Sequence, residues 1–317
     1  GQTLELADPI TFAGSEVIEP QNRKHTLFML RLENRLSDNA NQMLQTSYAK
    51  QVGEQPYYME KFQSYDIDYQ INMLLDFAQV DLGINYSYNE TPFIGSQYLS
   101  SENNVDAIKK YGGFAQASFP LIENKLDLII GDKSEHNSLT GWEHQPSVRF
   151  AWRVDNSQFL WASFSKGVRT PSLLEYDYNI QINGFKIGSV FETGNVLVDD
   201  TRLKTFLRGN NELQSEKIAS TELGYRLQQN TWNVDLSLFY SEAKNTLSIT
   251  PTADPLLVPS IMALLQTADF SGFYQYAQSQ TASFNLNSDS KQRAYGVDFI
   301  FNWQINPSAN MTLGLNY

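Results

Sequence analysis

Cysteine is absent from this 317-residue sequence, and so is any continuous apolar run of about 18 residues. The first absence excludes disulfide bonds and thiolate metal sites, and the second excludes a transmembrane helix. Basic residues are scarce, because 23 Lys and Arg stand against 35 Asp and Glu, for a net charge of -12. Binding to nucleic acid needs a basic surface, so that class of function is set aside.

A membrane-spanning β-barrel is compatible with this composition. The mean hydropathy is -0.39, but a barrel strand needs apolar residues only at every second position. The sequence starts at Gly1 without a signal-peptide pattern. We therefore expect a processed chain or a part of a longer one.

Alternation of apolar and polar residues is the strongest pattern in the chain. Between residues 65 and 73 every odd position is aromatic or aliphatic, and every even position is Asp, Gln or Asn. The same period of two recurs at residues 80–88, 147–154, 232–240 and 295–303. A helix would not separate these two sets. The pattern predicts about twelve antiparallel strands.

The connections between these strands alternate in length. Short turns are predicted near residues 36–41, 75–79, 120–124, 155–157, 229–230 and 305–309, and long connections near residues 52–62, 89–110, 132–146, 169–216 and 250–289. Short turns at one edge and long loops at the other are typical of outer-membrane barrels, whereas a soluble sandwich mixes both lengths.

The two faces of the predicted strands support the same interpretation. The apolar sets end in aromatic residues such as Tyr88, Tyr240 and Trp303, which suits the girdles at the two lipid interfaces. Charged residues such as Asp66 and Arg149 lie on the opposite face. An interior with this much charge predicts a wide barrel, since about eight strands would leave room only for side chains.

Three ordered segments carry a family resemblance. They are SKGVRTPSLLE at 165–175, GNNELQSEKIASTELGY at 209–225 and VDLSLFYSEAKNTLS at 234–248. Together they resemble the barrel of TonB-dependent outer-membrane receptors, over nearly all of residues 24–317. The chain departs from the family pattern at Asn211 and Ser215, where proline is usual, and at Asp132 and Lys133, where an Arg-Tyr pair is common.

The resemblance implies an all-β, antiparallel transmembrane β-barrel of about 22 strands with long extracellular loops. Residues 1–317 would be a partial barrel domain, with the plug domain and the C-terminal strands outside this chain. The implied function is TonB-coupled uptake of a ferric siderophore or similar iron chelate across the outer membrane of a Gram-negative bacterium. The implied partners are TonB with its inner-membrane complex, reached through the plug, the ligand, and outer-membrane lipid and lipopolysaccharide, with no cofactor.

Other functions stay open at this stage. A receptor of the same family for a vitamin or a carbohydrate is one alternative, and a passive porin-like or adhesin barrel is another. Aromatic residues beside amides at residues 250–289 favour a carbohydrate or a planar ligand. An enzyme is not expected, because Ser163 to Lys166 and Ser37 to Asn39 match hydrolase motifs in the wrong order and without the third motif.

Arginine and tyrosine in the long loops predict a site for an anionic, aromatic chelate, through charge-assisted hydrogen bonds and stacking. For Arg169 the alternative is that it ties its loop to acidic neighbours. We expect ligand binding by residues of the extracellular loops, namely Tyr57, Tyr58, Trp142, His144, Arg169, Tyr176, Tyr178, Arg202, Arg208, Tyr274 and Tyr276.

Metal binding by the protein itself is a further prediction. Asp199 and Asp200 offer hard oxygen ligands of the kind that Ca²⁺ prefers, in a loop-ordering role. His136 and His144 are expected to share one exposed loop with Trp142 and two Glu residues, where ordinary loop polarity is the alternative to a metal contact.

Overall fold

Twelve of the strands form one continuous antiparallel sheet in the computed structural model, which describes residues 3–7, 14–18, 22–54, 59–92, 99–186, 202–253, 263, 266 and 281–317. The sheet order is β19-β18-β15-β14-β11-β10-β9-β8-β6-β5-β4-β3. Its strands are β3 Asn22–Ser37, β4 Ala40–Glu54, β5 Met59–Leu74, β6 Gln79–Glu90, β8 Ala107–Ile122, β9 Leu126–Asn137, β10 Gly141–Arg153, β11 Gln158–Arg169, β14 Glu216–Gln228, β15 Trp232–Lys244, β18 Gln292–Asn306 and β19 Ala309–Asn316.

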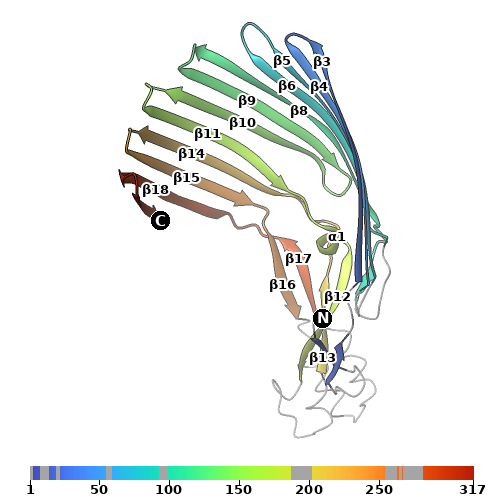
Figure 1. Cartoon of the computed structure of the whole chain (residues 1–317). Coiled ribbons are helices and arrows are strands. Elements are labelled where there is room, and N and C mark those ends of the chain that lie inside the picture. Colours follow the sequence, from blue (N-terminus) through green and yellow to red (C-terminus); the bar gives the residue numbers. More distant parts are fainter. Residues whose placement is uncertain are drawn as a thin grey trace.

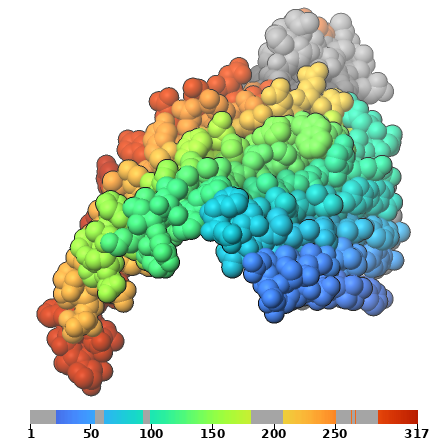
Figure 2. Space-filling model, turned by 90° about the horizontal axis from the view of Figure 1, so that it is seen from above, coloured from blue at the N-terminus to red at the C-terminus, as the bar shows by residue number. Residues whose placement is uncertain are grey.

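The twelve-stranded sheet curves through an open arc (Figures 1 and 2). Each strand follows its sequence neighbour in the sheet, apart from the short strands in the long connections, so the chain runs once along the arc. Several strands are 16 residues long, whereas about 9 to 11 residues cross a bilayer. The strands therefore extend beyond a membrane of ordinary thickness. The predicted all-β antiparallel fold of about twelve strands in this chain is confirmed.

Helices contribute little to the described part of the chain. The helix α1 covers Leu173–Tyr176. Among the described residues no helix has the length and apolar character needed to cross a membrane.

The fold has almost no apolar interior. Among the described residues, the buried hydrophobic side chains are Ala78, Leu173, Tyr178 and Leu213. Large apolar residues are instead exposed along one face of the sheet, including Ile84 at 65% and Leu223 at 52% of full exposure. A soluble protein of this size would bury such residues, so this face is built for contact with lipid.

The cross-strand register separates the two faces. Tyr69 pairs with Ile84 and with Leu44, and Leu223 pairs with Leu238. The intervening positions carry the polar pairs, such as Arg226 with Asp235. We call the first side the apolar face and the second the polar face. In a membrane barrel these are the lipid side and the lumen side.

The apolar belt is the run of apolar residues that each strand presents on the apolar face, for example Tyr65 to Met73 on β5 and Tyr295 to Trp303 on β18. Residue pairing leads in steps from Tyr295 through the intervening strands to Met73. One row of pairs thus joins the end of the belt nearer the long connections, on β18, to the end nearer the short turns, on β5. An offset of about one residue per strand corresponds to a tilt of roughly 35°, as in membrane barrels.

All six predicted short turns are confirmed, because paired strands approach from both sides of each. Their chemistry is local: Asp155 Oδ1 accepts hydrogen bonds from the backbone N–H groups of Ser157 and Gln158, at 2.7 and 2.9 Å. Asn124 adopts a positive φ of 59° in the turn between β8 and β9. Asp and Asn are the residues that turns of this kind favour.

Two of the predicted long connections are wrong. Residues 52–62 were expected to form one, but β4 continues to Glu54 and β5 starts at Met59, with Val52 paired to Lys61. Residues 132–146 were expected to form another, but β9 and β10 pair through this segment up to Asn137 and Gly141. The reason is physical, because strand ends that rise above the membrane face water and carry loop-like residues.

The other three long connections contain further strands. A five-stranded sheet, ordered β16-β17-β13-β12-β7, consists of β7 Leu99–Ser101, β12 Tyr178–Lys186, β13 Arg202–Arg208, β16 Leu247–Ala253 and β17 Thr281–Asn287. A separate two-stranded sheet pairs β1 Thr3–Ala7 with β2 Gly14–Ile18. The sequence pattern predicted none of these pairings.

The face assignment is testable by placing one charge on each side of β15. We expect Leu236→Arg, in the middle of the belt, to destabilise the natural full-length protein in lipid vesicles by about 2–4 kcal/mol. Its matched control is Ser237→Arg on the polar face, which we expect to change stability by less than about 0.5 kcal/mol. Denaturant unfolding followed by tryptophan fluorescence measures both. Equal losses in the two variants would contradict the assignment.

Candidate functional site

The three remaining long connections join into one structure at the end of the barrel, which we call the loop platform (Figure 1). It consists of β7, α1, β12, β13, β16 and β17. β12 pairs with β7 of the connection 91–106, and β13 pairs in parallel with β17 of the connection 245–291. The platform is thus a single sheet built from three loops that are distant in sequence.

The helix α1 starts the connection between β11 and β14 with a complete capping box. Glu175 N donates to Ser172 Oγ at 3.3 Å, and Ser172 N donates to Glu175 Oε2 at 2.8 Å. These reciprocal bonds satisfy backbone groups that a helix start leaves open. Pro171 and Leu173 are buried beside them, so the chain leaves β11 in one fixed direction.

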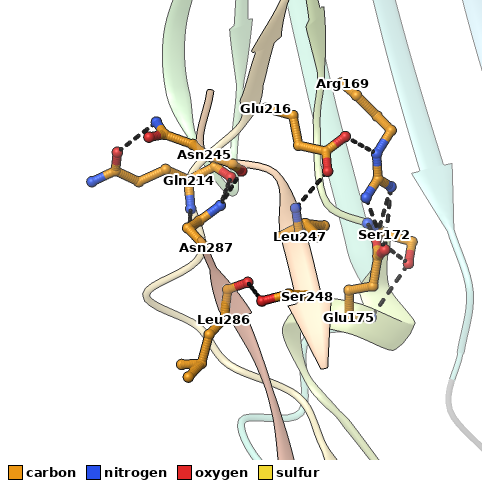
Figure 3. A network of polar contacts seen from close by, with 10 residues as sticks. All are labelled: Arg169, Ser172, Glu175, Gln214, Glu216, Asn245, Leu247, Ser248, Leu286 and Asn287. Carbon is orange, nitrogen blue, oxygen red and sulfur yellow. Dashed lines mark hydrogen bonds and ion pairs between the residues drawn. The ribbon is translucent and has the colours of Figure 1, made fainter. Parts of the chain in front are cut away.

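Arg169, the last residue of β11, connects this helix to the neighbouring strands (Figure 3). Its Nε donates to Glu216 Oε2 at 2.5 Å, and its Nη2 lies 3.1 Å from Glu175 Oε1. Glu216 Oε1 in turn accepts from the backbone N–H of Leu247 at 2.5 Å. One arginine thus joins the ends of β11 and β14 to α1 and, through Glu216, to β16.

Glu175 is held ionised by this arrangement. Burial raises its pKa, but hydrogen bonds from the backbone and hydroxyl of Ser172 and from the Arg169 guanidinium outweigh burial, so the pKa falls below the ordinary value. The capping box and the arginine bridge therefore both depend on the same charged carboxylate.

Side-chain amides hold the connection 245–291 against the connection between β11 and β14 (Figure 3). Asn287 Oδ1 accepts from the backbone N–H of Gln214 at 2.7 Å, and Asn287 Nδ2 donates to the carbonyls of Gln214 and Asn245 at 2.9 and 2.8 Å. Asn285, two residues earlier on β17, also binds a backbone group of that connection: its Nδ2 donates to the carbonyl of Arg208 at 3.2 Å. Two asparagines on one strand thus bind backbone groups of a separate loop.

Gly209 lies where the two ends of the connection between β11 and β14 come close to each other. Its N–H donates to the carbonyl of Tyr178 at 2.8 Å. A Cβ at this position would lie 2.7 Å from the backbone nitrogen of Asp177. Only glycine fits without a backbone shift, which gives a structural reason for the Gly-Asn pair in the second of the three ordered segments.

Asp177 holds the connection 91–106 in place. It is 1% exposed, and its carboxylate accepts hydrogen bonds from the backbone N–H groups of Asn103 and Val105 at 2.7 and 3.1 Å, and from the hydroxyl of Ser101. Burial raises its pKa, but these hydrogen bonds outweigh burial and leave the pKa below its ordinary value. A charged carboxylate thus fixes residues 101–105 to the end of α1.

The predicted ligand residues of the longest loop divide by role. Arg169 is engaged with two carboxylates, which supports its alternative reading as a tie within the loop. Tyr178, the first residue of β12, is buried, whereas Tyr176 at the end of α1 is half-buried. Arg208, the last residue of β13, is half-buried, and Arg202 is the first residue of the same strand.

Trp142 and His144 are placed differently from the expectation. Both lie on β10, so their assignment to an extracellular loop is wrong. Trp142 packs edge-on against His136 and Tyr111, with ring centroids 5.4 and 5.7 Å apart, at the aromatic end of the apolar belt. His144 Nδ1 lies 2.9 Å from Ser134 Oγ on the same face. These side chains project from the apolar face of the sheet, away from the lumen side.

The other predicted residues lie outside the described part of the chain. They are Tyr57, Tyr58, Tyr274 and Tyr276 for the ligand and Asp199 and Asp200 for calcium. Within the described ranges, no group of three or more His, Asp or Glu side chains is arranged to hold a metal ion.

Sequence reasoning missed most residues that build the platform. The capping box at Ser172 and Glu175 was readable as an S-x-x-E pattern before a short apolar run. Asp177, Asn285 and Asn287 gave no local signal, because their partners lie more than 40 residues away in the chain.

The importance of Asp177 is testable by removing its charge alone. We expect Asp177→Asn to lower the local opening free energy of residues 99–105 by about 2 kcal/mol, because an amide nitrogen then faces backbone donors. Hydrogen exchange of this segment in the natural protein measures the change. Asp106→Asn, an exposed site with the same change in charge, is the control and should leave exchange unaltered.

Acidification should reproduce this effect. Because the pKa of Asp177 is lowered in the folded protein, its contribution is complete above the ordinary pKa of about 4 and is lost as the pH falls through the lowered value. We therefore expect protection of residues 99–105 to fall below about pH 4 in the wild type, and much less in Asp177→Asn. Identical pH profiles would contradict the role given to Asp177.

Solved structures with the same fold include siderophore receptors and a copper transporter. The siderophore receptor PirA from Acinetobacter baumannii aligns with a TM-score of 0.69 and 12% identity, over 97% of this chain and 45% of that one. A mutant of the ferric enterobactin receptor PfeA from Pseudomonas aeruginosa, in complex with enterobactin, gives 0.71 and 14%, over 97% and 45%. The copper transporter OprC gives 0.57 and 14%, over 93% and 45%.

The chain spans less than half the length of each of these three structures. No curated protein matches its sequence. A family model described as "TonB dependent receptor-like, beta-barrel" matches residues 19–317, which is nearly the whole chain. Together with the tilted belt and the loops gathered at one end, this match confirms the resemblance found in the sequence: the chain belongs to the TonB-dependent receptor-like β-barrel family.

Proposed function

We propose that this chain is the barrel portion of an active transporter in the outer membrane of a Gram-negative bacterium. Its cargo is a ferric siderophore or a similar iron chelate, and its energy comes from TonB through a plug domain carried elsewhere in a longer protein. Family membership and structural similarity to siderophore receptors support the proposal. The loop platform is the single observation of this structure on which it rests.

The platform suits capture of a scarce ligand better than free diffusion. A passive pore does not need loops that are fixed to one another, whereas here three loops are joined by β-pairing and by buried or half-buried carboxylates. Fixed loops present a preformed surface, and preorganisation raises affinity because less conformational freedom is lost on binding. Arg202, Arg208 and Tyr176 are the residues of β13 and α1 that we propose for contact with an anionic chelate.

The polar face supports passage through the interior. It carries charged and hydrogen-bonding groups such as the Arg226–Asp235 ion pair and the Trp161 Nε1–H donor to Glu222 Oε1 at 2.8 Å. Such groups are stable where water or a polar plug fills the lumen of a wide barrel. A barrel of that width needs a plug to prevent leakage, which is why an energy source acting on the plug is part of the proposal.

Uptake in living cells tests the function. A strain lacking this receptor, complemented with the natural gene, is supplied with ⁵⁵Fe as catecholate, hydroxamate or carboxylate chelates, in cells with and without TonB. We expect one chelate class to be bound by both cell types and accumulated only with TonB. Accumulation that is equal in both would indicate a passive pore, and no accumulation of any iron chelate would leave another nutrient as cargo.

The role of the platform is tested in the same cells with a matched pair of variants. Arg169→Ala leaves Glu175 and Glu216 without their shared cation, so we expect chelate binding to weaken by about tenfold, or about 1.4 kcal/mol. Arg153→Ala removes an arginine of similar exposure that lies 3.7 Å from Asp127 at the opposite end of the barrel, and it should bind normally. Equal binding by both variants would argue against the platform as the ligand site.

A further inference from the structure

Three polar side chains interrupt the apolar belt on β9 and β10. On β6, β15 and β18 every position of the belt is aliphatic or aromatic. On β9 and β10 the same face of the sheet carries Asp132, Ser134 and His144, which we call the polar patch. In membrane-spanning segments such groups are costly against lipid and are found where another partner meets them.

The polar patch lies just inside the aromatic end of the belt, where β9 and β10 begin to rise out of the bilayer. Ser134 precedes the aromatic-end residue His136 by two positions, and Asp132 precedes Ser134 by two. The row of Asp132 continues through Ala115 on β8 to Leu82 on β6, and both of these residues belong to the belt. Polar residues therefore take the place of apolar ones at the lipid surface of β9 and β10.

The three side chains of the polar patch contact one another. Ser134 Oγ lies 2.8 Å from Asp132 Oδ2 and 2.9 Å from His144 Nδ1, so its single proton serves either neighbour. The side chains of His144 and Asp132 are 68% and 42% exposed. His144 Nε2 makes no hydrogen bond within the described part of the chain. The imidazole thus projects from the sheet with one ring nitrogen open to a partner.

A hollow of about 530 Å³ adjoins the polar patch. It lies over Gly113 and Ala115 of β8, which place little or no side chain between the larger residues of β6 and β9. The other lipid-side residues that line it are Tyr69, Ile71, Leu82, Ile84, Asp132 and Ser134. The Asp132 carboxylate thus stands at the edge of a recess in the lipid-facing surface.

The projecting imidazole and the hollow lie on opposite sides of β9. His144 is one strand away on β10, and Gly113 and Ala115 are one strand away on β8. Two copies in one membrane have the same orientation, so a two-fold axis between them must run along the membrane normal. Such an axis through β9 exchanges β8 and β10 across the interface. It places the imidazole of each copy over the hollow of the other, beside the other copy's Asp132.

We propose that this surface joins two copies of the protein into a symmetric dimer in the membrane. The imidazole of His144 in each copy enters the hollow of the other, and its Nε2–H donates to Asp132 there. The Ser134 hydroxyl then donates to Nδ1 and holds the ring in place. The inference rests on the outer-membrane location in the proposed function and is independent of the cargo.

A second copy fits this surface better than a different partner because the surface complements itself. The polar patch offers an acceptor in Asp132 and a donor in His144, and the two-fold axis satisfies each with the other. The small residues of the hollow let two surfaces approach closely, as small residues do at interfaces within membranes. Around the patch, Ile130 and Trp142 are 47% and 56% exposed. The interface would therefore have a hydrogen-bonded centre and an apolar rim.

Cross-linking in the native membrane tests the dimer, because residues 1–317 contain no cysteine that would compete. In the natural full-length protein, Ser134→Cys places a thiol next to the proposed axis, where the two copies face each other. The matched control is Leu238→Cys, one row inside the aromatic end of the belt on β15. With a short thiol-specific cross-linker we expect a covalent dimer from Ser134→Cys and a monomer from Leu238→Cys. Equal yields, or a product that contains a different protein, would overturn the proposal.

An exchange of the two pairing residues tests the contact itself. Asp132→His leaves two imidazoles facing each other across the interface, and His144→Asp leaves two carboxylates, so we expect each variant alone to associate about tenfold more weakly. When the two variants are mixed, both Asp–His pairs form again and association should return to that of the wild type. Energy transfer between differently labelled copies in lipid vesicles measures each case. Wild-type association of either variant alone, or no gain in the mixture, would contradict the dimer.

Uptake separates this inference from the proposed function. The polar patch lies on the lipid side of the sheet, whereas the loop platform stands at the end of the barrel. We therefore expect His144→Asp to accumulate the iron chelate at the wild-type rate. Normal uptake by a wild-type protein that is monomeric in the membrane would overturn the dimer and leave the proposed function standing. A cross-linked dimer that takes up no iron chelate would do the reverse.

Discussion

The unbroken backbone hydrogen-bond ladder across twelve strands is the interaction on which the rest of this structure depends. Lipid offers no partner to an exposed N–H or C=O group, so each strand must be satisfied by its neighbours. Once that ladder exists, alternate side chains face lipid and lumen, and a core is unnecessary. This explains why Ile84 and Leu223 are exposed while almost no apolar residue is buried in the described part of the chain.

The loop platform follows a different physical rule. It stands in water, and its parts are held by carboxylates and amides that bind backbone groups of other loops. Asp177, Glu175 and Glu216 each accept several hydrogen bonds, and Asn285 and Asn287 bridge separate connections. Polar bonds of this kind need defined partners, so they specify one arrangement of the loops where an apolar cluster would tolerate several.

The membrane part of the fold was largely predictable from the sequence, because a period of two is a local property. The errors arose at residues 52–62 and 132–146, where strands rise above the bilayer. There Asp132, Ser134 and His144 make a strand read as a loop. The platform was predictable only at Ser172 and Glu175, since a capping box is local. The parallel pairing of β13 with β17 joins segments separated by two barrel strands, and no local pattern encodes it.

That parallel pairing also constrains the order of biogenesis. β13 and β17 belong to connections on either side of the hairpin formed by β14 and β15. We therefore expect them to pair after that hairpin has taken its place between β11 and β18. We expect contacts between segments this far apart in sequence to form late in folding. The entropy cost of closing the long loop must be met before the contact contributes any stability. We therefore expect the loop platform, which the proposed function makes the ligand site, to be completed only after the strands that carry it are in place.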